Sequence, residues 1–175
     1  MSEQLSFDLP VVPGLGRDDF MIAPSNTVAL AMIETSQSWV GGKLVLCGPE
    51  GSGKTHLVHV WAGTNGGKTL DATSLTHADI PTLAQGPMVI EDVPEIAQNH
   101  ATQTALFHLH NLMQSNGQPL LMTGRGAPNH WAMSLPDLQS RIDAAGVGTL
   151  MAPDDTLLGA VIAKHFSDRQ LMPRP

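Results

Sequence analysis

Residues 48–55 read Gly-Pro-Glu-Gly-Ser-Gly-Lys-Thr and stand between an apolar run, 43–47, and a segment with helical periodicity, 56–62. Glycines at these spacings let backbone N–H groups curl around phosphate oxygens, and the helix that follows adds its positive amino end. A strand, a glycine-rich loop and a helix in this order predict a P-loop. A plain tight turn would not require a Lys-Thr pair at this offset.

In such a loop the lysine reaches the β- and γ-phosphates and the next hydroxyl ligates Mg²⁺. Lys54 and Thr55 hold these two positions. The predicted ligand is ADP or ATP with Mg²⁺. The residues expected to contact it from the loop and the first helical turn are Pro49, Glu50, Gly51, Ser52, Gly53, Lys54, Thr55 and His56.

An acidic pair, Glu91 and Asp92, follows the apolar segment 88–90. Downstream of a P-loop, carboxylates at a strand end are suited to hold Mg²⁺ and to orient an attacking water. We therefore assign both residues a catalytic role, and we expect Thr55 and Asp92 to face the metal that the nucleotide brings. The alternative is a solvated strand end.

Apolar and periodic segments alternate along the rest of the chain, which favours a doubly wound α/β fold with a five-stranded parallel sheet covered on both faces. We place residues 1–17 in an extended tail and residues 18–175 in one nucleotide-binding domain. The expected strands are 43–47, 68–71, 88–90, 119–123 and 148–151, and the expected helices are 26–36, 56–62, 102–115, 135–143 and 154–166, with Ser25 as a cap.

Composition narrows the possible functions of the chain. A net charge of −7 without a basic run disfavours direct binding to duplex DNA. The single cysteine, Cys47, allows no disulfide framework, and no apolar stretch approaches the ~20 residues of a membrane span, so we expect a cytoplasmic protein. The pairs His56/His59 and His108/His110 lack further ligands for zinc, and Trp61 and Trp131 are expected in the core.

Six segments together resemble the nucleotide-binding domain of the DnaA-related AAA+ family. They are FMIAPSNTVAL at 20–30, GPEGSGKTHL at 48–57, MVIEDV at 88–93, LFHLHNLM at 106–113, LLMTGRGAPNHW at 120–131 and LPDLQSRI at 135–142. The resemblance implies a P-loop AAA+ core with strand order 5-1-4-3-2. Within the family it is greatest to the regulators that inactivate DnaA.

The resemblance also implies roles for residues outside the P-loop. Phe20, Ile22 and Asn26 match the segment that lies against the adenine, although ordinary packing is the alternative. Thr123 falls at the sensor-1 strand end, and Arg141 falls at the arginine-finger position of box VII. For Arg141 the alternatives are a surface ion pair with Asp137 or Asp143, and Arg125 is the next candidate for the finger.

The tail contains Gln4-Leu5-Ser6-Phe7-Asp8-Leu9, which resembles the peptide that docks these regulators on the DNA polymerase sliding clamp. A glutamine head and apolar anchors would enter a pocket of the clamp, with Gln4, Leu5, Ser6, Phe7 and Leu9 as the contacts. The implied partners are DnaA and the clamp, with DNA and the nucleoid reached only through the clamp, no membrane contact, and possible assembly with further copies.

Two departures from the family pattern bear on catalysis. Glu91 stands where the family has Asp, and its extra methylene shifts the carboxylate relative to Mg²⁺, so we expect weak or no intrinsic ATPase activity. The sequence ends LMPRP where the family continues into a helical lid with the sensor-2 arginine, so we expect this lid to be missing from the chain.

We therefore expect a clamp-associated regulator of replication initiation that binds adenine nucleotide and promotes hydrolysis of DnaA-bound ATP. Two other functions remain open. One is an autonomous AAA+ ATPase or helicase loader, and the other is a nucleotide-binding, DnaA-like adaptor without a catalytic role.

Overall fold

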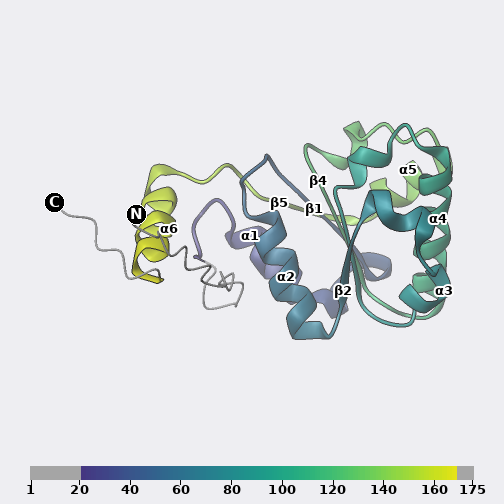
Figure 1. Cartoon of the computed structure of the whole chain (residues 1–175), viewed down its shortest axis with the longest axis horizontal. Coiled ribbons are helices and arrows are strands. Elements are labelled where there is room, and N and C mark those ends of the chain that lie inside the picture. Colours follow the sequence, from purple (N-terminus) through teal and green to yellow (C-terminus); the bar gives the residue numbers. More distant parts are fainter. Residues whose placement is uncertain (1–20, 169–175) are drawn as a thin grey trace, which may run out of the picture.

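The fold is built on a five-stranded parallel sheet in a computed structural model of the chain, of which residues 21–168 are described (Figure 1). The order of the strands is β2-β3-β4-β1-β5, which confirms the doubly wound α/β fold and the order expected from the sequence. The strands are β1 (Lys43–Cys47), β2 (Lys68–Asp71), β3 (Met88–Glu91), β4 (Leu120–Gly124) and β5 (Gly146–Thr149).

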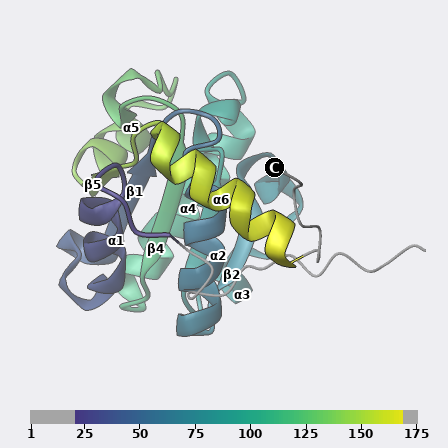
Figure 2. The same ribbon diagram turned by 90° about the vertical axis from the view of Figure 1, so that its left-hand side faces the viewer.

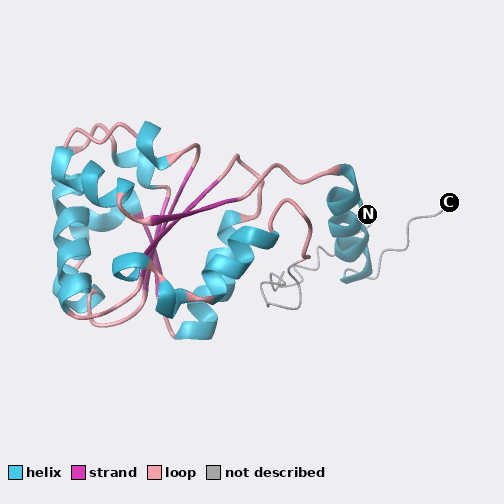
Figure 3. Ribbon diagram, turned by 180° about the vertical axis from the view of Figure 1, so that it is seen from behind, coloured by secondary structure: helices cyan, strands magenta, loops and turns pink. Residues whose placement is uncertain are grey.

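Helices cover both faces of this sheet, with α1 and α2 on one face and α3, α4 and α5 on the other (Figure 3). Alternate residues of β1 divide between two hydrophobic clusters: Leu44 and Leu46 pack with α1 and α2, and Val45 and Cys47 pack with α4 and α5. The helices are α1 (Thr27–Glu34), α2 (Lys54–Asn65), α3 (Ile80–Leu83), α4 (His100–Ser115), α5 (Pro136–Asp143) and α6 (Asp155–Asp168).

The predicted position of the fifth strand, 148–151, was wrong by two residues, since β5 spans Gly146–Thr149. The strand was predicted too far toward the carboxyl terminus because Leu150 and Met151 are both apolar. Leu150 is fully buried, but it lies just beyond the strand, where its N–H donates to the Cys47 carbonyl. A Cβ at Gly148 would stand in ordinary contact, at 3.6 Å, with Ala29 of α1, so α1 packs closely against this strand.

The amino end of α1 also differs from the prediction. Asn26, and not Ser25, is the N-cap residue, and its side chain makes no cap hydrogen bond. Instead, its amide nitrogen donates to the Met21 carbonyl and its amide oxygen accepts from the Ala23 N–H, both at 2.9 Å. Asn26, which is 5% exposed, therefore fixes the segment that leads into α1.

Helix α6 lies at one end of the domain and contributes no buried residue (Figure 1). Figure 2 looks at the molecule from that end and shows α6 in front of the rest of the domain. Within the described part of the chain, no helix is long and apolar enough to cross a membrane. The predicted tail and its clamp-binding residues lie outside the described residues.

Because Leu121 in the central strand β4 is completely buried, Leu121→Ala should lower the free energy of unfolding by about 2–5 kcal/mol. The matched control is Leu158→Ala on α6, where the side chain is 44% exposed and the change should stay within about 0.5 kcal/mol. Urea unfolding followed by circular dichroism measures both. Equal losses in the two variants would contradict this packing of the sheet.

Candidate functional site

The glycine-rich loop leaves the carboxyl end of β1 and enters α2, as predicted. Gly51 and Gly53 have φ angles of 73° and 93°, in the left-handed region that favours glycine. Gly53 is also the N-cap residue of α2, so no side chain caps the first turn of that helix. Backbone N–H groups at a helix start without a side-chain cap attract anions, and this geometry suits a phosphate group.

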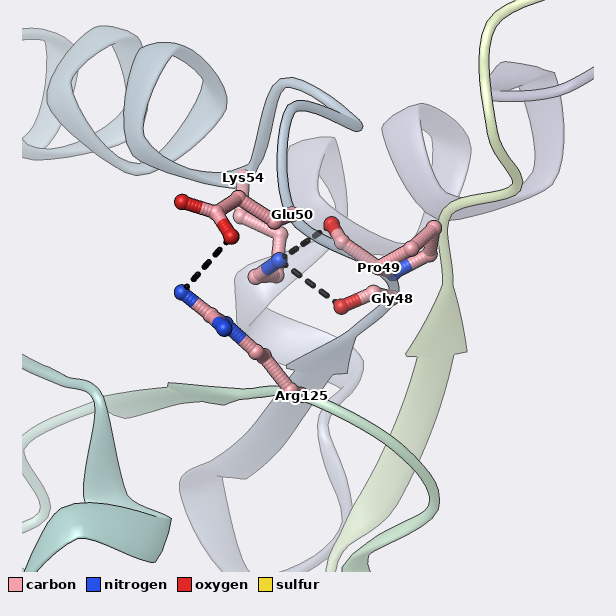
Figure 4. A network of polar contacts seen from close by, with 5 residues as sticks. All are labelled: Gly48, Pro49, Glu50, Lys54 and Arg125. Carbon is pink, nitrogen blue, oxygen red and sulfur yellow. Dashed lines mark hydrogen bonds and ion pairs between the residues drawn. The ribbon is translucent and has the colours of Figure 1, made fainter.

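Lys54 places a cation inside this loop. The residue is only 9% exposed, and its Nζ donates to the carbonyl oxygens of Gly48 and Pro49, each at 2.8 Å (Figure 4). Burial lowers the pKa of Lys54, an effect that the nearby carboxylate of Asp92 opposes. Anionic phosphate oxygens make stronger bonds to an ammonium than neutral carbonyls do, so the buried lysine suits a phosphate ligand.

The carboxylate beside the P-loop threonine is that of Glu91. The Thr55 hydroxyl donates to it, and His59 Nε2 lies 4.0 Å from Glu91 Oε2. Burial raises the pKa of Glu91, whereas the Thr55 hydrogen bond and the nearby His59 act in the opposite direction. The sequence predicted Thr55 and Asp92 as the pair that faces magnesium, but the structure joins Thr55 to Glu91. His59, expected only to pack or to lie at the surface, is thus part of the site.

Asp92 turns away from the path of β3. It is exposed and adopts a left-handed φ of 55°, which Asp tolerates better than most residues. Its N–H donates to Thr123 Oγ1 at 3.1 Å, and Thr123 at the end of β4 is 1% exposed. Thr123, the predicted sensor-1 residue, therefore binds the turn that carries Asp92, and the Asp92 carboxylate lies close enough to Lys54 to raise the pKa of its ammonium.

Arg125 also lies at the P-loop, which the sequence did not predict. Its Nη2 is 3.1 Å from Glu50 Oε2 (Figure 4). Sequence reasoning treated Arg125 only as a second candidate for an arginine finger. The predicted order of the strands could have placed Arg125 at the P-loop. Strand β4 adjoins β1, so the residues that follow these two parallel strands meet at the same end of the sheet.

The residues expected to contact adenine are only partly described. Phe20 lies outside the described residues, and Ile22 is 67% exposed. The amide of Asn26 is committed to the backbone of Met21 and Ala23, which supports the packing alternative for this residue. The Met151 N–H donates to the Ser25 carbonyl at 3.0 Å, so this segment runs beside the exit of β5. The adenine contacts stay a prediction.

Arg141 lies near the amino ends of the strands, whereas the P-loop follows the carboxyl end of β1. It is exposed on the last turn of α5, which leads into the start of β5. Its neighbours include His110 and Lys43, since the charges of both Lys43 and Arg141 add to the burial that lowers the pKa of His110 to about 4. Asp143, one alternative partner of Arg141, accepts a hydrogen bond from Gln139 at 2.8 Å. Arg141 therefore does not serve its own P-loop.

No three His, Cys, Asp or Glu side chains within residues 21–168 are grouped so that they could hold a metal ion. Mg²⁺ at this site would need oxygen ligands from a nucleotide in addition to the chain's own groups. Thr55 and Glu91 supply a hydroxyl and a carboxylate at one place, which are ligand types that Mg²⁺ accepts. When bound, the ion would neutralise charge on the phosphates.

A parallel α/β sheet with a P-loop between β1 and α2 defines a P-loop fold of the nucleotide-binding type. No protein-family model matches the chain. In sequence it is 25% identical over 162 residues to the replication initiator DnaA 1 of Chlamydia trachomatis serovar D, covering 71% of this chain and 36% of that protein. It is 28% identical over 143 residues to DnaA 1 of Chlamydia pneumoniae, covering 67% of this chain and 31% of the relative.

Solved structures agree with this relation at the level of the fold. The AMPPCP-bound DnaA of Aquifex aeolicus superposes with a TM-score of 0.74 at 16% identity, over 93% of this chain and 57% of that one. Domain III of Thermotoga maritima DnaA gives 0.73 at 20% identity, over 95% and 79%. The DnaC helicase loader gives 0.58 at 17% identity, over 77% and 93%. The chain is thus similar in sequence to DnaA proteins and shares the fold of the solved DnaA structures, and it spans about a third of the length of the curated relatives it matches.

Replacing Glu91 by glutamine should stabilise the protein at neutral pH. The raised pKa means that the folded state disfavours the charged carboxylate, so stability falls as pH rises through the titration of Glu91. Glu91→Gln should therefore raise the thermal midpoint at pH 7, and the gain should shrink as the pH falls and Glu91 of the wild type takes up its proton. Thermal melts from pH 5 to pH 8 test this, with the exposed Glu95→Gln as control. A gain that is largest at pH 5 would contradict the prediction.

Proposed function

We propose that this protein is a nucleotide-binding regulator of replication initiation of the Hda type. In this proposal it binds ADP or ATP in its P-loop, docks on the sliding clamp through residues 4–9, and presents Arg141 to the nucleotide held by DnaA. The DnaA-bound ATP is then hydrolysed. The observation that carries the proposal is the separation of the two sites, with the P-loop at one edge of the sheet and Arg141 at the other.

The nucleotide part of the proposal is supported by the geometry of the loop. Gly51 and Gly53 have left-handed backbones, α2 begins without a side-chain cap, and the buried ammonium of Lys54 lies inside the loop. The related DnaA of Aquifex aeolicus was solved with AMPPCP bound, which supports an adenine nucleotide as the ligand. Thr55 and Glu91 would hold Mg²⁺ on the phosphates.

The regulatory part is supported by the position of Arg141. A guanidinium exposed on α5, away from its own P-loop, is accessible to a second molecule. Guanidinium groups bond two phosphate oxygens at once and stay charged, as an arginine finger requires. Glu91, hydrogen-bonded to Thr55 and close to His59, suits a chain whose own hydrolysis is weak.

A helicase loader remains the competing function, because the DnaC loader shares the fold. A loader or other autonomous ATPase would turn over ATP by itself and would act on a helicase or on nucleic acid. Steady-state ATP turnover by the isolated chain separates the two functions. The regulator should show little activity without DnaA and the clamp.

We expect Lys54→Ala to abolish nucleotide binding, because the buried ammonium is placed to meet the β- and γ-phosphates. The affinity for ADP should fall by at least about a hundredfold, since a charged bond to phosphate is lost from a buried site. Calorimetric titration measures the change. Lys68→Ala, at the exposed amino end of β2, is the matched control and should bind as the wild type does. Equal affinities for wild type and Lys54→Ala would refute the site.

We expect both Arg141→Ala and Arg141→Lys to lose the stimulation of DnaA. An arginine finger contributes roughly 10³–10⁵ in rate, whereas an exposed ion pair contributes only ~0–1 kcal/mol of stability. The assay is hydrolysis of DnaA-bound ATP in the presence of DNA-loaded clamp. Both variants should keep binding ADP, because Arg141 lies away from their own P-loop. Near-normal stimulation by either variant would assign the active arginine elsewhere.

The same assay tests the proposed tail. Gln4→Ala combined with Leu5→Ala should remove stimulation and retention on immobilised clamp, because the head and one apolar anchor of the peptide are lost. Nucleotide binding by this variant should stay unchanged. A double mutant that still binds the clamp like the wild type would show that residues 4–9 do not dock there.

A further inference from the structure

The backbone around Arg125 is fixed by packing. The indole N–H of Trp131, a residue that is 4% exposed, donates to the carbonyl oxygens of Arg125 at 2.9 Å and Gly126 at 3.1 Å. A Cβ at Gly124 would come within 2.5 Å of both Trp131 and Pro94, so no larger residue fits there without a shift. The segment after β4 is therefore held rigidly, and the direction of Arg125 is set by the fold.

The side chain of Arg125 is much freer than its backbone. It is 62% exposed, and its partner Glu50 is 78% exposed. Ion pairs that are this exposed contribute little to stability, so the contact is not what holds the P-loop in place. The guanidinium is thus aimed at the loop by a rigid backbone while its tip can exchange partners at low cost.

The strand order shows which groups lie near the Arg125 guanidinium. Strand β4 stands between β1, which leads into the P-loop, and β3, which leads into Glu91 and Asp92. A third phosphate that extends from the loop toward this acidic pair must pass the end of β4. Lys54 lies close to the same spot, since the charges of Asp92, Arg125 and Glu50 all act on its pKa.

We propose that Arg125 binds the third phosphate of a nucleotide in the chain's own P-loop, exchanging the Glu50 carboxylate for phosphate oxygens. This inference rests on the nucleotide binding proposed above. A guanidinium can bond two phosphate oxygens at once, and the dianionic terminal phosphate is a stronger acceptor than one carboxylate in water. Arg125 then acts in cis and distinguishes triphosphate from diphosphate.

The role of Glu50 follows from this exchange. Its carboxylate lies on the loop that would hold the phosphates, so it repels a nucleotide unless Arg125 neutralises it. Glu50 and the third phosphate would compete for one guanidinium. Because only a triphosphate would draw Arg125 away from Glu50, this competition weakens triphosphate binding more than diphosphate binding.

The test is calorimetric titration of the full chain with ADP and with AMPPCP, for wild type, Arg125→Gln and Glu50→Gln. Arg125→Gln should weaken AMPPCP binding by about tenfold, the loss of one charge-assisted contact, and ADP binding by clearly less. Glu50→Gln should tighten AMPPCP binding by up to about fivefold. Lys68→Gln removes the same charge from the amino end of β2 and should leave both affinities unchanged.

Three results would overturn the assignment of Arg125. In the first, Arg125→Gln binds AMPPCP like the wild type while Lys54→Ala does not bind, so the P-loop proposal survives without Arg125. In the second, Arg125→Gln loses ADP and AMPPCP equally and its thermal midpoint falls, so the residue is structural. In the third, the wild type binds neither nucleotide, and the proposed function fails together with this inference.

Discussion

The parallel pairing of β1 with β4 is the constraint on which the site depends. It places Cys47 beside Gly124, and the Gly48 N–H donates to the Gly124 carbonyl, so the P-loop and the segment after β4 begin at the same point. Strand β3 pairs with the other side of β4 and brings Glu91 and Asp92 to the same edge. The charged groups of the site therefore come from three separate parts of the chain.

Hydrogen bonds between these three segments then set the positions of the charges. The Thr55 hydroxyl holds the Glu91 carboxylate, and the Thr123 hydroxyl accepts the Asp92 N–H. The first contact joins the start of α2 to the end of β3, and the second joins the turn after β3 to the end of β4, so a phosphate ligand would meet groups that are already ordered. Preorganised donors and charges of this kind need little rearrangement when a ligand arrives. Arg125 is an exposed member of the site, and hydrogen bonds from Trp131 hold its backbone.

The two edges of the sheet differ in chemistry. The carboxyl edge collects the P-loop, the acidic pair and Arg125, and it suits a nucleotide. The amino edge holds the buried Lys43, whose pKa burial lowers to about 8, together with His110 and the exposed Arg141. The function proposed above requires two separate surfaces, and the P-loop and Arg141 lie at opposite ends of the strands of the sheet.

The sequence by itself determined the P-loop and the parallel sheet, because glycine spacing and apolar periodicity are local properties of the chain. The order of the strands came from the family resemblance. The sequence prediction misplaced β5 by two residues, since Leu150 is buried without belonging to the strand. Only the tertiary structure decided that Glu91 reaches Thr55 and that Arg125 faces Glu50. These contacts join residues that are far apart in sequence. They depend on the register of neighbouring strands and on a left-handed turn at Asp92, and local sequence patterns encode neither.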